Sequence, residues 1–535
     1  MSPPRDHKKQ KIAQNQYSGY TISSSTSEIT TIDLSTSSTT PQDFFSEYIS
    51  KRKPVKIIDS DKNSQFVDVE KFQLRNLKTT LNYNEEPLQV EELFQGGFGS
   101  GQKRIDMKLS DLIDEFKKGD RELYLTTQYD REEENEEEVE EEENDEEEKV
   151  NDADESEKED AEKEEADEEE DEGAGLFDQM SNASSINMND LHDDFDDFDN
   201  LSNDNDEGDS EYEAYQRVRT LYQPPLTNLA KSPLVLPTNP PLIPNLIPQQ
   251  INIWMGKTSH KSNRTQFSID TSQQLTKLDR SIPNNGTSSG LHHDHADNLY
   301  ILVQGRKRFT IYSPADAMKL YTVGKVYKIF SNGVIDYETS EQFPNWRSIR
   351  DDGAMIEDVL NWQISQAEDE DEIERLNELL DLQESKRKSI NSNSQKSKEA
   401  KFSGEQSQSK DPPSFSKIPP SLLHIDEVED VKQQEKLIEF ANTHFPGFLK
   451  LNNITIWLSP GEMLYLPASW FHEVSSFGSD DDDNDGVHIA LNYWFVPPNT
   501  DNSNNSYKDQ YWEQDWQETM RAIDVFKNAA KEENA

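Results

Sequence analysis

One long acidic stretch limits what this chain can fold into. Residues 131–213 hold 42 Asp and Glu against four Lys and Arg, within a chain of 535 residues whose formal charge is -53. Such a segment buries too little apolar surface to fold, and its like charges repel one another. Because the remaining sequence has the charge of an ordinary soluble protein, we expect one folded module interrupted by disordered insertions, rather than several domains.

The acidic insertion, placed at 129–213, has two interpretations. The simpler one is a solubilising surface segment, and the alternative is electrostatic attraction of a basic partner or substrate. A direct role in binding nucleic acid is excluded, because phosphates would be repelled.

Changes in composition give the other boundaries. Residues 1–38 are rich in Ser and Thr and are expected to be a disordered tail, and 39–128 alternate predicted helices and strands. The main core is placed at 214–500, with disordered insertions at about 257–288 and 385–415. Residues 505–535 form an amphipathic helix. Its apolar stripe predicts docking on the core or a homodimer, and the two tryptophans slightly favour the dimer.

The chain contains no cysteine. That excludes disulfides, thiolate zinc sites and a cysteine nucleophile. No apolar run approaches the length of a membrane span, and the polar N-terminus has no secretory apolar region. We expect a protein of the cytoplasm, or of the cytoplasm and nucleus, that does not bind a membrane.

A histidine and a carboxylate lie two residues apart, at His292 and Asp294. Alternate residues of an extended chain share a face, so these two side chains supply two thirds of a 2-His-1-carboxylate iron site. The candidate for the third ligand is His472, which begins a strand after a proline-containing bend and is flanked by aromatic residues. His293 and His295 also share a face and form the competing pair.

The next segment predicts a β-hairpin with a two-residue turn at Gln304-Gly305. In that register Asn298 and Lys307 lie on the face that carries His292 and Asp294. A buried lysine there would suit the far carboxylate of a chelating diacid. The alternative is a surface lysine, because a shift of one residue would reverse the face.

Four short apolar segments near the C-terminus are separated by Pro, Gly or polar turns. They predict antiparallel strands and a mainly β fold, a sandwich or jelly roll with flanking helices, that could bury a metal between its sheets. The predicted strands are 454–458, 463–466, 471–476 and 488–496.

Taken in order, these motifs resemble the jumonji-C (JmjC) oxygenases. The matching pieces are His292-x-Asp294 with Asn298 and Lys307 downstream, the run 461–472 that ends in Trp-Phe-His, and Leu-Asn-Tyr-Trp-Phe at 491–495. The chain is most similar to the hydroxylase branch, and within it to lysyl (3S)-hydroxylases of developmentally regulated GTP-binding proteins. Weaker matching extends to 54–58 and 253–256, and the resemblance as a whole covers roughly 41–128 and 214–515 with gaps.

The resemblance implies a double-stranded β-helix, or cupin core, that binds Fe(II), 2-oxoglutarate and O2. It implies that His292, Asp294 and His472 hold the iron, and that Lys307 pairs with the distal carboxylate of 2-oxoglutarate. Other residues implied around the co-substrate and pocket are Asn298, Tyr124, Ser289, Asn492, Trp494 and Tyr300.

The activity implied is hydroxylation of a lysine side chain in a protein substrate, with release of succinate and CO2. The expected partner is a basic, lysine-rich protein segment, such as one in a GTP-binding protein. One alternative is a JmjC histone lysine demethylase, although no chromatin-reading motif is recognisable. Another is a non-catalytic acidic binding or chaperone protein on a cupin scaffold.

Overall fold

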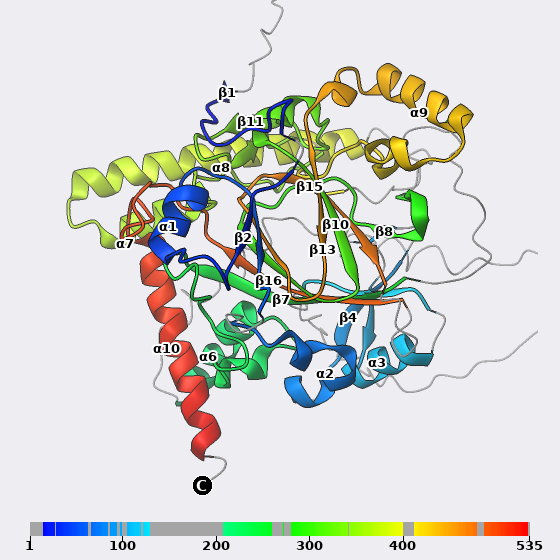
Figure 1. Cartoon of the computed structure of the whole chain (residues 1–535). Coiled ribbons are helices and arrows are strands. Elements are labelled where there is room, and N and C mark those ends of the chain that lie inside the picture. The colour runs from blue at the N-terminus through cyan, green and yellow to red at the C-terminus, as the bar shows by residue number, and fades with distance from the viewer. Residues whose placement is uncertain are drawn as a thin grey trace, which may run out of the picture. The chain divides into compact units, whose positions relative to one another are not determined.

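Two β-sheets that face each other form the framework of the described residues (Figure 1). The larger has nine strands in the order β2-β3-β14-β9-β16-β7-β6-β4-β5, and the smaller has four in the order β13-β10-β15-β8. Tyr300 and Leu464 of the larger sheet and Phe309 of the smaller join one buried cluster, so the inner faces pack together. This is the jelly-roll core that the sequence predicts.

The structure is a computed structural model. Its described residues all belong to one unit, which comprises residues 1–128 and 185–535. Within that unit the structure describes residues 14–26, 28–61, 66–83, 86–93, 97–98, 104–118, 121–128, 207–258, 271, 280–340, 342–399, 411–478 and 486–532.

The strands of the two large sheets are mostly three to ten residues long, and a small third sheet has the order β1-β11-β12. Their bounds are β1 Gln14–Asn15, β2 Thr31–Asp33, β3 Val55–Ile58, β4 Leu88–Glu92, β5 Arg104–Met107, β6 Leu123–Leu125, β7 Pro248–Lys257, β8 Thr287–Ser288, β9 Asp297–Gln304, β10 Arg306–Tyr312, β11 Val326–Ile329, β12 Ile335–Tyr337, β13 Ile454–Leu458, β14 Met463–Leu466, β15 Phe471–Phe477 and β16 Val487–Phe495.

The helices lie outside the sheets. They are α1 Pro41–Phe44 with a π-helical turn Phe45–Ile49, α2 Leu74–Leu81, α3 Leu109–Lys118, α6 Glu207–Leu221, α7 Ile356–Gln366, α8 Glu370–Glu399, α9 Val431–His444 and α10 Tyr511–Glu532. Short 3-10 helices span Val69–Phe72, Thr227–Lys231, Pro283–Asn285, Pro314–Lys319, Pro420–Leu423, Ile425–Glu427 and Phe448–Lys450. None of the helices in the described part of the chain has the length and apolar character needed to cross a membrane.

The central strands β9 and β16 are buried along both faces. Ile489 and Leu491 of β16 point outward into a cluster that α1, α2, α3 and α6 cover, whereas Ala490 points toward the smaller sheet. Helices on one face and a second sheet on the other explain why these strands consist of nearly continuous apolar residues. The polar side chains of the inner face, among them His488 and Asn492, therefore have no access to bulk water.

The start of β9 is fixed by a buried ion pair. Arg52 donates to the Asp297 carboxylate at 3.0 Å, and Asp297 also accepts from the Tyr465 hydroxyl at 2.5 Å and from the backbone N–H of Ala468 at 2.9 Å. These bonds tie the loop before β9 to β14 and to the segment that leads into β15. The contacts of Asp297 therefore hold the C-terminal end of the loop that carries His292 and Asp294.

The predicted hairpin between β9 and β10 is wrong. β9 pairs with β14 and β16 in the larger sheet, while β10 pairs with β13 and β15 in the smaller one. Gly305, at φ +80°, turns the chain from one sheet to the other. Inward-facing residues of β9 and β10 still meet, but across the space between the sheets: the rings of Tyr300 and Phe309 lie 5.0 Å apart.

Several predicted boundaries need correction. Residues 14–38 are not all a disordered tail, because β2 adds in parallel to β3 and buries Ile32. The acidic insertion ends before 213, since α6 begins at Glu207, and the part up to 206 lies outside the described residues. The insertion predicted at 385–415 includes the end of α8, to Glu399, and a described segment from 411.

The C-terminal helix α10 docks on its own chain. It packs along α6, where Arg217 and Asp515 form an ion pair at 2.7 Å, and Ile523 and Trp512 of its apolar stripe are buried. Docking on the core, one of the two outcomes predicted from the stripe, is therefore observed. The homodimer remains a prediction.

Candidate metal centre and co-substrate pocket

The loop before β9 and the start of β15 bring three candidate ligands together. The backbones of His292 and His472 exchange two hydrogen bonds, 3.0 Å from the N–H of His292 and 2.7 Å from that of His472. The N–H of Ser469 donates to the carbonyl of Asp294 at 2.7 Å. Backbone pairing thus sets the spacing of side chains that are 180 residues apart in sequence.

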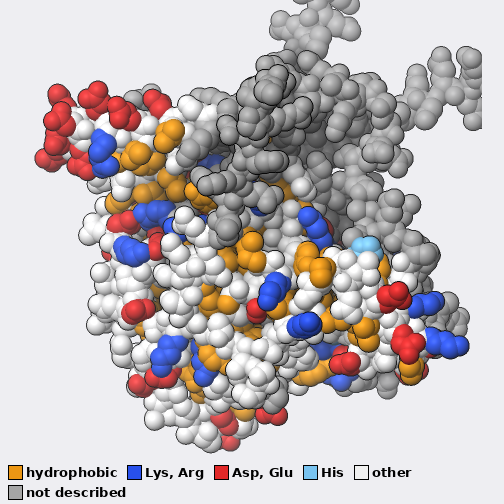
Figure 2. Space-filling model, turned by 90° about the horizontal axis from the view of Figure 1, so that it is seen from above, with side chains coloured by type: hydrophobic (Ala, Val, Ile, Leu, Met, Phe, Trp, Pro, Cys, Tyr) orange, Lys and Arg blue, Asp and Glu red, His pale blue; other side chains and the backbone are white. Residues whose placement is uncertain are grey.

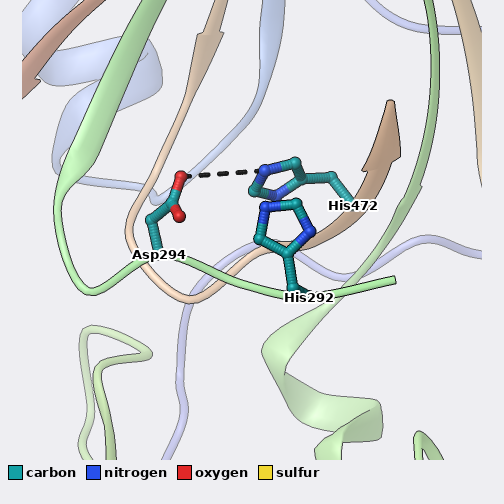
Figure 3. Close-up of side chains that lie close together, drawn as sticks. All are labelled: His292, Asp294 and His472. Carbon is teal, nitrogen blue, oxygen red and sulfur yellow. Dashed lines mark ion pairs between the residues drawn. The ribbon is translucent and has the colours of Figure 1, made fainter. Parts of the chain in front are cut away.

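The three side chains converge (Figure 3). One ligand atom from each of His292, Asp294 and His472 lies within 4.8 Å of the other two, and the Nε2 of His472 is 3.7 Å from an oxygen of Asp294. The two imidazole centroids are 4.4 Å apart. Among the described residues this is the group of His and carboxylate side chains that could hold a metal ion.

Backbone carbonyls select the histidine nitrogens that face the cluster. The Nδ1 of His292 lies 3.0 Å from the carbonyl of Gly290, and the Nδ1 of His472 lies 2.9 Å from that of Trp470. A carbonyl only accepts, so each Nδ1 is assigned the proton. Each Nε2 then presents a lone pair, as a metal ligand requires.

The electrostatics of the cluster suit a bound cation. Burial lowers the pKa of His292 well below its ordinary value, which keeps the imidazole neutral. Burial also raises the pKa of Asp294, although His472, Asn298 and Trp494 oppose that shift. A cation would favour the carboxylate form, and two imidazoles with one carboxylate on one side form the donor set of non-haem Fe(II).

The competing pair is directed elsewhere. His293 hydrogen-bonds through Nε2 to the Tyr337 hydroxyl at 2.6 Å, and the Nε2 of His295 donates to the carbonyl of Ile335 at 2.9 Å. Both rings pack against aromatic side chains, His293 against Phe471 and His295 against Trp346. The Nε2 atoms of both rings are already used, and among the described residues neither histidine belongs to a group of three or more side chains that could hold a metal ion.

Lys307 lies in a second cluster of polar side chains between the sheets. Its ammonium donates to the Tyr124 hydroxyl at 3.2 Å and to the Ser476 hydroxyl at 2.5 Å, and the residue is 1% exposed. Burial lowers its pKa to about 7, partly offset by Glu473. Lys307 makes no ion pair within 4.0 Å with any described acidic residue. A buried ammonium whose partners are neutral hydroxyls is suited to binding a carboxylate.

The other predicted pocket residues are placed as follows. Asn298 lies opposite Trp494 in the β9–β16 register, and its Oδ1 has no hydrogen-bond partner in the part of the chain that the structure describes. The Oδ1 of Asn492 accepts from the Trp254 indole at 2.6 Å. The Ser289 hydroxyl donates to the Gly290 carbonyl and accepts from the N–H of Val474, so backbone groups already use it.

Two aromatic residues complete that set. Tyr300 packs edge-on against Phe309 between the sheets. Trp494 lies edge-on to Trp254, with ring centroids 6.2 Å apart, and its indole is near Asp294. Both side chains lie on the inner face of the larger sheet.

Some pocket residues were not predicted. Phe415 stacks on the His292 ring at 4.8 Å with an interplanar angle of 14°, and the Arg280 guanidinium lies 5.2 Å from the Phe415 centroid. Both lie within the segments that the sequence predicts to be disordered insertions, at about 257–288 and 385–415, so no local pattern indicated them. Ser476 could have been found, because it lies four residues after His472 in a strand and shares its face.

Comparisons with known proteins agree with this geometry. The family model described as a cupin-like domain matches residues 41–501. The chain is also 26% identical over 520 residues to the JmjC domain-containing protein 4 of Schizosaccharomyces pombe (strain 972 / ATCC 24843), a match that covers 88% of this chain and 86% of the relative.

Proposed function

The chain belongs to the cupin-like domain family, and on this premise we propose that it is an Fe(II)- and 2-oxoglutarate-dependent protein hydroxylase. One observation carries the proposal: a His-Asp-His cluster, in which His472 is buried and the other two residues are half-buried, shares the inner face of the smaller sheet with the buried Lys307. Lys307 has no acidic partner among the described residues. The similarity to a JmjC domain-containing protein supports the same class of oxygenase.

Two groups of residues have separate roles in the proposed site, one in binding iron and the other in binding 2-oxoglutarate. His292, Asp294 and His472 would hold the iron from one side and leave the opposite positions open. Lys307, with the hydroxyls of Tyr124 and Ser476, would bind the distal carboxylate of 2-oxoglutarate. Bound iron, O2 and 2-oxoglutarate would together supply oxidation of a substrate C–H bond, with succinate and CO2 as co-products.

The protein matrix contributes orientation and exclusion of water. The carbonyls of Gly290 and Trp470 fix the two imidazoles, and Phe415 shields one of them. Tyr300 and Phe309 fill the space between the sheets beside the pocket. A dry site strengthens the interaction of Lys307 with an anion.

For the substrate we propose a lysine side chain in a basic segment of a protein, such as a GTP-binding protein. The acidic composition of 131–213 would favour the approach of such a segment. The absence of cysteine removes the thiolate zinc fingers that could read chromatin, which favours hydroxylation over histone demethylation.

The test is a turnover assay on purified protein supplied with Fe(II), 2-oxoglutarate and candidate protein substrates. We expect succinate release, together with a product that has gained one oxygen atom by intact mass. Loss of a methyl group instead would identify a demethylase. Absence of succinate with every substrate, and of any 2-oxoglutarate binding, would indicate a non-catalytic protein.

Asp294→Ala is the decisive variant. We expect it to abolish succinate release and to weaken Fe(II) binding by more than about 100-fold, because a direct ligand is lost. The melting temperature should not fall, since burial already disfavours the Asp294 carboxylate. Asp524→Ala, an exposed position on α10, is the matched control and should behave as wild type.

A further inference from the structure

His488 is a buried polar group that the proposed site has not yet used. It is the second residue of β16, is 0% exposed, and neither ring nitrogen has a hydrogen-bond partner among the described residues. Its ring centroid lies 5.5 Å from that of Tyr124, the residue whose hydroxyl accepts from Lys307. Buried polar groups normally have partners, so this imidazole calls for one.

The backbone around His488 makes room for the ring. In the β16–β7 register His488 lies opposite Gly256, where a Cβ would come within 2.5 Å of both His488 Cε1 and Tyr124 Cδ2. At Gly305 a Cβ would lie 2.8 Å from the Cβ of His488. Two glycines therefore allow an imidazole and a phenol to lie side by side next to the Lys307 ammonium.

The protonation state of His488 determines which hydrogen-bonding groups its ring can provide. Burial, together with the positive charge of Lys307, lowers its pKa well below the ordinary value. A neutral imidazole has one N–H donor and one acceptor. Beside a cation and two hydroxyls, an N–H donor complements an anion.

We propose that His488 is a positioning and specificity residue of the co-substrate pocket, which donates a ring N–H to the carboxylate that Lys307 binds. This inference rests on the proposed function. A carboxylate has two oxygens and about four acceptor positions, and Lys307, Tyr124, Ser476 and His488 offer four donor groups. His488 thus adds to the preference for a keto diacid over a keto monoacid.

The experiment measures binding without turnover. Protein loaded with Mn(II) in place of Fe(II), under anaerobic conditions, is titrated with 2-oxoglutarate and with 2-oxobutyrate by calorimetry. For His488→Leu we expect 2-oxoglutarate to bind about 10- to 100-fold more weakly, the range for a hydrogen bond to a charged group. The affinities for 2-oxobutyrate and for Mn(II) should change little. The ratio of 2-oxoglutarate affinity to 2-oxobutyrate affinity should therefore be smaller in His488→Leu than in wild type.

Two further variants separate recognition from folding. His488→Gln keeps an N–H donor and should recover part of the lost affinity, whereas His444→Leu, an exposed position on α9, should bind as wild type does. If His488→Leu does not fold, the His488→Gln titration and the shift of the wild-type imidazole ¹⁵N resonance on adding 2-oxoglutarate decide the question.

The outcomes are distinguishable. A wild-type protein that binds metal but no 2-oxoglutarate overturns the proposed function and this inference with it. A wild-type protein that binds 2-oxoglutarate, with the Leu and Gln variants equally tight and the imidazole resonance unmoved, overturns only the role of His488.

Discussion

Two backbone carbonyls decide how the candidate iron ligands are presented. Gly290 and Trp470 each lie two residues before the histidine that they orient, so each contact is local and survives small shifts of the sheets. The third ligand, Asp294, is held instead by its own carbonyl, which accepts from Ser469. Ligand geometry is therefore set by main-chain bonds, and side-chain substitutions at a distance should affect it weakly.

Lys307 links co-substrate affinity to pH. Its pKa in the folded protein is about 7, because burial disfavours the ammonium. A bound carboxylate favours the charged form, so the complex holds more protons than the free protein above pH 7. We expect 2-oxoglutarate affinity to fall as pH rises from 7, with proton uptake detectable by calorimetry in buffers of different ionisation enthalpy.

Lys307→Met tests this assignment. The variant should lose 2-oxoglutarate binding and the associated proton uptake, while the melting temperature of the unliganded protein rises by about 2–4 °C. Burying Lys307 lowers the stability of the wild-type protein at pH values where the lysine is charged in the unfolded chain but loses its proton readily in the folded one. The stability gained by Lys307→Met should therefore shrink as pH rises toward 10.5. Unchanged binding, or a loss of stability near pH 7, would make Lys307 a structural residue.

At the scale of elements, two polar segments meet beside the His-Asp-His cluster. Arg280, just before β8, donates to the carbonyl of Ser289 at 2.8 Å and pairs with Asp411 at 3.0 Å. The segment that follows Asp411 carries Phe415 onto the ring of His292. Segments of the chain more than 100 residues apart thus share one ion pair beside a candidate ligand.

Phe415→Ala probes that contact. We expect metal affinity to fall by about 10-fold, the lower end of the range for groups that support a ligand, with the fold retained. Phe445→Ala removes a phenyl ring that is also buried but belongs to a cluster around α9 that does not include the ligands, and it should lower stability without changing metal affinity. Equal metal binding in the two variants would refute a supporting role for Phe415.

The sequence predicted the strands better than their partners. Pro, Gly and polar turns located β13, β14 and β15 to within one residue, and alternation of side chains correctly placed Asn298 and Lys307 on inner faces. The hairpin was wrong because a turn pattern does not say whether the chain returns in the same sheet or crosses to the other. The prediction that Asn298 and Lys307 point inward was still correct, because side chains on the inner faces of both sheets meet in the space between the sheets.

The site was predictable to the same degree. His292, Asp294 and His472 could be grouped from spacing and from a family resemblance. Phe415 could not, because contacts that depend on long-range chain crossings leave no periodic signal in a polar segment. β2 was missed for a related reason: a three-residue edge strand gains its stability from the neighbouring β3, and not from its own composition.

On the scale of the whole molecule, charge is unevenly divided. On the face shown in Figure 2, Lys and Arg side chains are scattered among apolar and uncharged ones, and the densest group of acidic side chains lies at one edge, with others spread over the face. Residues 131–213 carry 42 of the 107 acidic residues of the chain. If a basic substrate is attracted over a distance, that attraction comes mainly from this segment and should be screened by salt.

Replacing residues 131–200 with an uncharged Gly/Ser linker of equal length separates the two interpretations of this segment, and it leaves α6 intact because the helix begins at Glu207. We expect unchanged metal content, unchanged 2-oxoglutarate affinity and a melting temperature within about 2 °C of wild type, since the segment lacks the apolar residues of a core.

If the acidic residues attract a basic substrate, KM for a lysine-rich peptide should rise by about 3- to 10-fold at low salt and converge with wild type at about 0.5 M salt. If they only solubilise the protein, KM stays constant at every salt concentration and the variant precipitates at a lower protein concentration. Loss of iron or 2-oxoglutarate binding would contradict both interpretations, because it would mean that residues of this segment help to build the pocket.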